Sequence, residues 1–351
     1  MSELKTNKIS TNDQNNVAID NALGLKSYGT TARNALTSVA GDIIYNSTTN
    51  KPEYFNGSAW QDMVSPVVGI SYLVIAGGGS GGAHGGGGGG AGGYRNSYAS
   101  ETSGANSSTE TKYYYIKDIT GNITVTVGAG GTGRNANGGS GAVGIKGSDS
   151  VFATVTSIGG GSGGHETNGG AGGSGGGATH YNSSYSGGAG TANQGNSGGN
   201  NNSASPYPSG GGGGAGSAGG NGSGSTAGAG GNGLASSITG SSVTRAGGGG
   251  GGGTDFGAAG GAAGTGGATA GANANGNSSS ATVNTGSGSG GGARTNGDSG
   301  SGGSGVVILR WATADATIGG TRTGLTDGNV QTDGSDSYIV FTAGTGTITF
   351  S

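Results

Sequence analysis

The amino-acid sequence predicts a mostly β and irregular protein with almost no α-helix. Three observations lead to this fold class. First, 94 of the 351 residues are glycine, and they gather in runs such as 85–90, 210–214 and 247–253. Second, short apolar segments of β-strand character separate the runs, and third, helix-forming residues rarely follow one another. Because glycine loses more backbone entropy on folding than any other residue, the runs are either disordered or held in an architecture that only glycine permits.

Residues 1–66 are predicted to form a small β-meander that oligomerises. Strands are expected over 42–46, 52–55 and 59–63, because these apolar stretches alternate with turn sequences that contain Asn and Gly. Pro66 marks the boundary to the next domain. A segment of this length buries little apolar core by itself, so we expect it to oligomerise.

Residues 67–311 are predicted to form an ordered glycine-rich domain flanked by short β-strands. A strand over 71–76 leads directly into glycine, and further strands are expected in ordinary segments between the runs. These segments are 113–116, 123–127, 150–155, 237–239 with Val243, and 306–311. A flexible linker is the alternative. The linker interpretation is less favoured, because a linker seldom needs more than 200 residues and does not need strand segments at regular intervals. Collagen is excluded, because the chain has only four prolines and no strict Gly-X-Y period.

An ordered glycine domain without collagen sequence is expected to be a bundle of polyglycine II-type extended helices. Such helices have three residues per turn and a rise of about 3.1 Å per residue, so a 17-residue run such as 77–93 would span roughly 50 Å. Their backbone N–H and C=O groups point outward in three directions and can bond to neighbouring helices on every side. Ala and Ser are expected at the outer positions of this bundle.

The C-terminal residues 312–351 regain ordinary β character. Residues 338–342 and 347–350 are apolar strands on either side of Ala343–Gly346, which predicts a β-hairpin that packs on the glycine-rich domain.

The composition argues against nucleic acids and membranes as partners. The formal net charge is −3 and no basic run occurs, which argues against binding to nucleic acid or to an anionic membrane surface. No apolar stretch reaches the length of about 20 residues that a spanning helix needs, so we expect no membrane insertion. The N-terminal residues MSELKTNKIS lack the apolar core of a secretory signal peptide. The absence of cysteine excludes disulfides and thiolate metal sites.

No set of residues predicts an enzyme. Gly-x-Gly-x-x-Gly matches occur throughout such a sequence, and the strand over 71–76 is followed by no helix that could complete a dinucleotide site. The acidic residues are scattered, and no serine lies in a strand-to-helix elbow. His165 and Glu166 are either metal ligands or an acid/base pair, or else solvated loop residues, and the loop interpretation is favoured. We therefore expect no catalytic residues, no cofactor and no metal.

The bulky residues between the glycine runs are the candidates for recognition. Tyrosine-rich loops on a rigid support are typical of binding surfaces, although the same rings could instead cap the ends of the bundle. Tyr113–Tyr115 and Phe152 lie in strand segments and favour the structural role. The loops at 180–185, 205–209 and 254–256 favour binding, and they supply the candidate contact residues His180, Tyr181, Tyr185, Tyr207, Asp255 and Phe256.

Several segments resemble a known family. Tyr72–Gly79 followed by a glycine run that ends at Tyr94, Val125–Gly131, Ser157–Gly161, Val283–Gly286 and Gly302–Trp311 are similar, in this order, to the glycine-rich domain of phage tail proteins. The strand pair that precedes this domain in the family is matched here at the C-terminus, by Ile339–Phe350. In the N-terminal part, Arg33–Leu36, Gly41–Asn46 and Tyr54–Trp60 resemble the attachment segment of tailed-phage fibres.

The resemblance implies a structural virion protein, a bacteriophage tail fibre or fibre-tip adhesin, whose distal loops bind a host surface glycan or outer-membrane protein. It further implies a homotrimer that is attached to other virion tail or fibre proteins through the N-terminal segment and assembled in the host cytoplasm. A capsid-decorating or other structural fibre without a dedicated receptor is the alternative. An enzyme that degrades host polysaccharide is a third, less favoured one.

Overall fold

The computed structural model describes residues 24–63, 67–117, 121–136, 140–320 and 322–351. The described residues before and after position 66 form two separate compact units. The N-terminal residues 1–23 and Pro66, which carry part of the attachment prediction and the predicted boundary, lie outside the described residues. In the described part of the chain the only helices are the five-residue α1 (Thr30–Asn34) and the short 3-10 turn η1 (Gly104–Asn106). The prediction of a mostly β protein with almost no helix is therefore confirmed.

The first unit is a four-stranded sheet with α1 beside it. Its strands are β1 (Ser27–Tyr28), β2 (Ile43–Asn46), β3 (Lys51–Phe55) and β4 (Trp60–Asp62). β1 pairs parallel with β2, and β2, β3 and β4 pair antiparallel in chain order. Within residues 24–63, Ile44 is the only buried apolar side chain. The buried carboxylate of Glu53 instead accepts from Asn46 at 2.9 Å and pairs with Arg33 at 3.1 Å.

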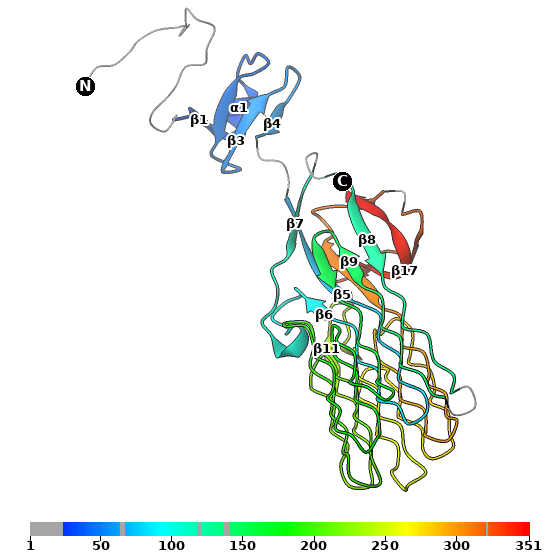
Figure 1. Cartoon of the computed structure of the whole chain (residues 1–351). Helices are drawn as coiled ribbons and strands as arrows, with labels where there is room; N and C mark the ends of the chain where they lie inside the picture. The colour runs from blue at the N-terminus through cyan, green and yellow to red at the C-terminus, as the bar shows by residue number, and fades with distance from the viewer. Residues whose placement is uncertain (1–23, 64–66, 118–120, 137–139, 321) are drawn as a thin grey trace, which may run out of the picture. The chain divides into compact units, whose positions relative to one another are not determined.

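The second unit contains an 11-stranded sheet that nearly closes into a barrel (Figure 1). Its central strand order is β10-β9-β8-β17-β13-β5-β6. Where the two edges approach each other, Arg95 on β6 donates from Nη1 to the carbonyl of Thr156 on β10 at 3.3 Å. The strands are β5 (Val67–Ile75), β6 (Tyr94–Asn96), β7 (Tyr113–Ile116), β8 (Ile123–Val127), β9 (Ser150–Phe152), β10 (Val155–Ser157), β13 (Val306–Ala312), β14 (Ile318–Gly319), β15 (Leu325–Asp327), β16 (Gln331–Asp333) and β17 (Asp336–Phe350).

The conventional apolar core lies on this sheet. Aromatic and β-branched side chains from β5, β8, β9, β13 and β17 form its largest cluster, in which Phe152 and Phe341 are fully buried. The indole of Trp311 packs edge-on to Phe350 and donates to the carbonyl of Ala316 at 2.9 Å. The structural role predicted for Phe152 is thus confirmed, whereas Tyr114 on β7 is 58% exposed.

Three strand predictions are wrong in detail. The segment 150–155 is not one strand, because Ala153 adopts φ 51° and turns the chain between β9 and β10. Residues 237–239 lie in the loop between β11 (Leu234–Ser236) and β12 (Val243–Arg245). The C-terminal hairpin is a single 15-residue strand, β17, because Gly344 at φ 90° bends the chain without reversing it. The first part of β17 bonds to β13 and the second part to β8, so no hairpin partner is needed.

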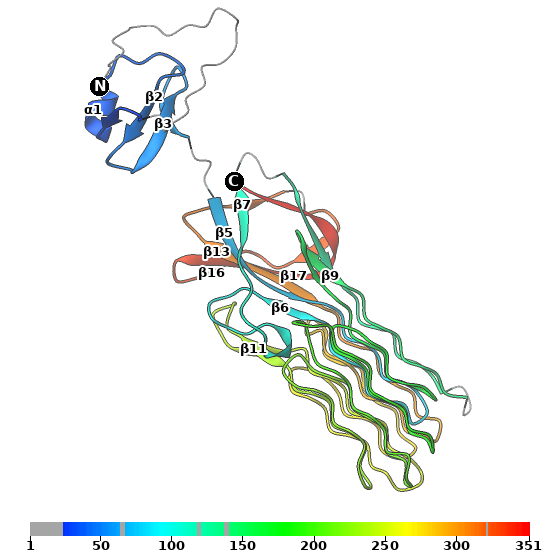
Figure 2. The same ribbon diagram turned by 60° about the vertical axis from the view of Figure 1, so that its left-hand side comes forward.

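The glycine-rich residues between the strands form a bundle of extended legs that run side by side (Figure 2). A run leaves a strand, turns at the end far from the sheet and comes back. The run 77–93 leaves β5, turns at His84 and Gly85, and returns to β6, with Gly79 N–H donating to the Gly90 carbonyl at 2.9 Å. The predicted span of roughly 50 Å for this run is therefore wrong. Each leg has about seven residues and could span at most roughly 25 Å even if it were fully extended.

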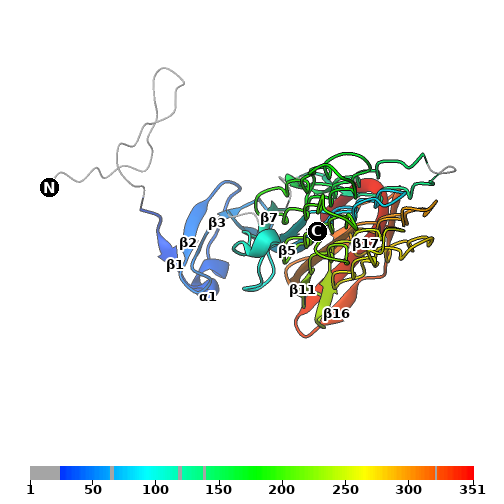
Figure 3. The same cartoon turned by 60° about the horizontal axis from the view of Figure 1, so that its bottom comes forward.

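The hydrogen bonds of these legs have a three-residue period. Along residues 87–92, the first and fourth amides donate to carbonyls of segment 161–164, the second and fifth to segment 210–213, and the third and sixth to segment 286–289. The N···O distances are 2.8–3.1 Å. One leg is thus bonded to three different neighbours, and Figure 3 shows legs lying above and below one another as well as side by side. Backbone hydrogen bonds in several directions hold the bundle together. In a flat sheet, by contrast, a strand bonds only to the two neighbours in its own plane.

Small side chains also lie inside the bundle, against the prediction that Ala and Ser occupy its outer positions. Ala91, Ala178, Ser80 and Ser209 are completely buried. A serine hydroxyl can both donate and accept, so it takes the place of a backbone partner. The Ser80 hydroxyl accepts from the Ile145 amide at 2.8 Å, and the Ser209 hydroxyl donates to a backbone carbonyl at 2.7 Å.

We predict that Gly88→Ala destabilises the second unit severely. A Cβ at this position would lie 2.1 Å from the carbonyl oxygen of Gly249, and backbone atoms cannot move away as a side chain can. The expected loss is about 3 kcal/mol or more in the free energy of unfolding, measured by thermal or denaturant melting. Gly328→Ala is the control, since nothing lies within 4 Å of its Cβ position. Equal stability of the two variants would contradict the close packing of the legs.

Candidate functional site

The turns at the end of the bundle far from the sheet carry most of its bulky polar and aromatic residues. We call them the tip loops (Figure 1, bottom). They include turns at 83–86, 165–168, 180–184, 202–207, 254–258 and 294–297. In the interior legs, neighbouring backbones leave no room for large side chains. Large side chains therefore lie mainly in the turns, although the leg that contains Val143 and Ile145 exposes both of these residues.

Left-handed backbone conformations build these turns. His84, Glu166, Tyr207 and Asn296 all have φ between 49° and 58°. This region is unfavourable for a bulky residue such as tyrosine unless the surroundings hold it there. In this case Tyr207 N–H bonds to the Ala204 carbonyl at 2.8 Å, and the hydroxyl of buried Thr254 donates to the Pro206 carbonyl at 2.7 Å. The second bond ties the loop at 202–207 to the loop at 254–258.

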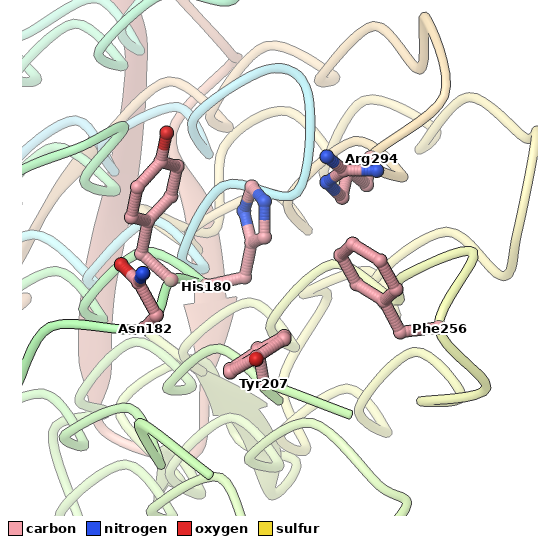
Figure 4. Close-up of a pocket in the computed structure, with 6 residues that line it drawn as sticks. His180, Asn182, Tyr207, Phe256 and Arg294 are labelled. Atoms are coloured by element: carbon pink, nitrogen blue, oxygen red, sulfur yellow. The ribbon is translucent and has the colours of Figure 1, made fainter. Parts of the chain in front are cut away.

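Four tip loops surround one open pocket with a volume of about 230 Å³. Its lining residues are His180, Tyr181, Asn182, Tyr207, Phe256 and Arg294. Figure 4 shows Arg294 and Phe256 on one side, Asn182 across from them, and His180 and Tyr207 between. The rings of Tyr207 and Phe256 meet edge to face with centroids 5.4 Å apart. Phe256 is 50% exposed and Tyr181 38%, so both present apolar ring surface to a ligand.

Arg294 is held in place by two contacts from the loop at 254–258. Its guanidinium carbon lies 4.3 Å from the ring centroid of Phe256, a cation–π distance. Its Nη1 donates to both carboxylate oxygens of Asp255, at 2.7 and 2.9 Å. Burial raises the pKa of Asp255, but the hydrogen bond and charge of Arg294 outweigh that effect and leave the pKa below its usual value. At neutral pH the pair therefore consists of two opposite charges that cancel.

His180 is the most deeply buried residue of the pocket, at 2% exposure. Its Nδ1 lies 2.8 Å from the Gly85 carbonyl. Because a carbonyl only accepts, Nδ1 carries the proton and Nε2 is left as an acceptor. Burial lowers the pKa of His180 to about 4; the bond to Gly85 opposes this, and the charges of Arg294, His84 and His165 reinforce it. The imidazole is therefore neutral near pH 7.

All three histidines of the chain meet beside this pocket. The ring of His84 lies 5.8 Å from that of His165 and 6.2 Å from that of His180, centroid to centroid. Burial lowers the pKa of His84, with His165 and Arg294 acting in the same direction and Asp255 and Glu166 against it. Within the described part of the chain, no three His, Cys, Asp or Glu residues are placed to hold a metal ion. The loop interpretation predicts that both residues are solvated. Glu166 is exposed, as predicted, but His165 is half-buried against His84.

The structure brings most of the sequence-predicted contact residues together. His180, Tyr181, Tyr207 and Phe256 line the pocket, and Asp255 is bonded to its arginine. Tyr185 does not line it; the chain there is half-buried, and its amide donates to the Asn201 side chain at 2.7 Å.

Two lining residues were missed by the sequence analysis. Asn182 lies inside a predicted contact loop, but it was not selected because asparagine is small and occurs often in this sequence. Arg294 follows the same rule that selected Phe256, because it is a bulky residue between two glycine runs, so the rule should have included charged side chains as well as aromatic ones.

Comparison with known proteins identifies one family. A family model described as a glycine-rich domain matches residues 56–312. No curated protein and no solved structure matches the chain. Within the residues that the structure describes, no helix has both the length and the apolar character to cross a membrane.

We predict that the tip loops lose stability as the pH falls from about 6.5 toward 4. The pKa of His180 is lowered in the folded state, so the unfolded chain binds more protons in this window and acid favours unfolding. The contribution of neutral His180 to stability is fully present above about pH 6.5, the pKa of a histidine in the unfolded chain. Each pH unit below that value lowers the free energy of unfolding by up to about 1.4 kcal/mol. The effect is measured by hydrogen exchange of residues 178–186 at several pH values, expressed as protection factors relative to the intrinsic exchange rate at each pH.

His180→Gln is the matched variant for this experiment, because its amide can still donate to the Gly85 carbonyl but does not titrate. It should weaken the pH dependence of the protection factors, and the part that remains would come from His84, whose pKa is also lowered. Wild-type protection factors that stay constant over this window would contradict the prediction.

Proposed function

This chain belongs to the glycine-rich domain family, and on that premise we propose that it is a structural protein of a bacteriophage virion, a tail fibre or fibre-tip adhesin that binds the bacterial host surface. The observation that carries the proposal is the open aromatic pocket formed by the turns at 180–182, 207, 256 and 294. Such a pocket on a rigid support is typical of recognition sites rather than of purely structural fibres.

We further propose that the legs of the bundle are polyglycine II-type helices. The three-residue period of their hydrogen-bond partners supports this conformation, since a helix with three residues per turn faces each neighbour once per turn. Such a bundle is a stiff support for the tip loops, because moving one leg would break bonds to three neighbours. Rigid presentation lowers the entropy that a loop loses when it binds.

The N-terminal unit is the proposed attachment point to other tail or fibre proteins, and the functional assembly a homotrimer. The single buried apolar side chain among residues 24–63 supports this assignment, because a unit with so little core gains stability from a partner. Several pockets on one virion would raise the overall avidity well above the affinity of one site without any new contact.

The bundle conformation predicts slow amide exchange in the glycine runs. In a sample labelled with ¹⁵N only in glycine, most glycine N–H signals should persist in D₂O for hours, because interior amides are bonded to neighbouring legs. Disordered glycine runs would instead exchange their amides within minutes or less at neutral pH. Loss of nearly all glycine signals at the first time point would therefore rule out the ordered bundle.

The adhesin proposal predicts that tip-loop variants lose binding to bacterial cells. Labelled protein is incubated with a broad panel of strains, and binding to the positive strains is compared between wild type, Tyr207→Asn and Phe256→Ala. Asparagine tolerates the left-handed backbone at position 207, so the loop can keep its shape. We expect binding to fall at least about tenfold, as the loss of a central aromatic contact produces.

Tyr114→Ala is the control for these variants, because Tyr114 is an exposed aromatic residue, as Phe256 is, but lies on β7. Its binding should match that of the wild type. If both tip variants bind cells as well as the control does, the tip loops are not the adhesive surface. A structural fibre of the capsid or tail without a receptor would then explain the chain better.

A further inference from the structure

The size of the tip pocket suits one small ring rather than an extended ligand. Its volume of about 230 Å³ lies below the range of about 300–1,000 Å³ that is typical of sites for drug-sized molecules. The exposed ring of Phe256 and the half-buried ring of Tyr207 both line the pocket, and they offer apolar surface against which the C–H face of a sugar ring could pack. The edge-to-face contact between these rings and the bond from Thr254 to Pro206 fix that surface before a ligand arrives.

The polar groups of the pocket include donors and acceptors in similar measure. Nε2 of His180 accepts, the Asn182 amide can do both, and so can the hydroxyls of Tyr181 and Tyr207. Arg294 uses Nη1 for Asp255, and its other N–H groups have no protein partner among the described residues. A sugar hydroxyl both donates and accepts, so it can use every group of this mixed set. A carboxylate could use only the donors.

The charge of the site also disfavours an anionic ligand. Arg294 is the one ionised side chain that lines the described pocket, and both oxygens of Asp255 are already bonded to it. The other titratable groups close to the site are the histidines 84, 165 and 180 and the carboxylate of Glu166. An incoming anion would therefore meet a guanidinium that Asp255 already neutralises, with the carboxylate of Glu166 as the next charge close to the site.

From these observations we infer that the tip pocket binds a neutral pyranose unit of a surface saccharide, and that Asp255 sets this selectivity by neutralising Arg294. The inference rests on the proposed function and names the ligand class of the same site. Asp255 acts here as a positioning residue, since it does not line the pocket but fixes both the place and the net charge of the arginine.

The experiment compares neutral and acidic probes on the full-length protein. Methyl glycosides of glucose, galactose, mannose and N-acetylglucosamine are the neutral probes, and methyl glucuronide and N-acetylneuraminic acid are the acidic ones. Saturation-transfer NMR and titration measure binding to wild type, Tyr207→Asn, Phe256→Ala and the control Tyr114→Ala. We expect at least one neutral glycoside to bind, with at least about tenfold weaker binding in the two tip variants.

Asp255→Asn tests the role of the carboxylate. The asparagine oxygen can still accept from Arg294, so the arginine keeps its place over Phe256 while the pocket gains one positive charge. We expect methyl glucuronide to bind about fivefold to tenfold more tightly in this variant at low salt, and the neutral glycoside to change little. Asp327→Asn is the matched control, because Asp327 pairs with Arg322 at a site distant in sequence from the tip loops.

The outcomes separate this inference from the proposed function. Wild-type preference for an acidic probe, or an unchanged preference in Asp255→Asn, overturns the inference and leaves the adhesin proposal in place. The same holds if no saccharide binds but the tip variants still abolish cell binding, since the ligand is then a protein. If neither saccharide nor cell binding depends on the tip loops, both proposals fail.

Discussion

Hydrogen bonding between closely packed backbones is the interaction on which the rest of this structure depends. Along residues 87–92 each successive amide bonds to a different neighbouring leg, and the partners repeat every third residue. Legs can approach this closely only where no side chain intervenes, as at Gly88 and Gly212, where a Cβ would lie about 2 Å from a neighbouring carbonyl oxygen. A typical backbone bond contributes only about 1 kcal/mol net, so the bundle relies on many of them together.

Because backbone hydrogen bonds hold the legs together, the sheet, the legs and the turns of the second unit accept side chains of different sizes. The barrel-like sheet holds the large apolar side chains and anchors the ends of many legs, because β5, β8, β10 and β13 are each continuous with one. The legs exclude bulk almost entirely. The turns at the far end need neither an apolar core nor close backbone packing, so they can hold bulky polar and aromatic residues. Tyr207, Phe256 and Arg294 therefore lie side by side there, although they come from separate parts of the chain.

The sequence allowed the division into strands, glycine runs and bulky loop residues to be predicted, because each has its own composition. It did not reveal the reversal inside the run 77–93, since the turn uses His84 in a left-handed conformation that favours glycine or asparagine. Nor did it indicate that β17 would be continuous, because whether Gly344 reverses or merely bends a strand depends on which strands lie beside it. The pocket itself depends on contacts between turns far apart in sequence, which local patterns do not encode.

The pairing of Asp255 with Arg294 joins the architecture of the tip to its chemistry. Asp255 and Phe256 belong to one turn and Arg294 to another, so the ion pair and the cation–π contact both bridge the turns. The pair is only partly buried, so its net contribution to stability is small, and its main effect is on the geometry and charge of the pocket. Substitutions in such turns can alter the ligand while the backbone lattice of the legs stays unchanged. A glycine bundle therefore separates the residues that hold the fold together from those that decide what it binds.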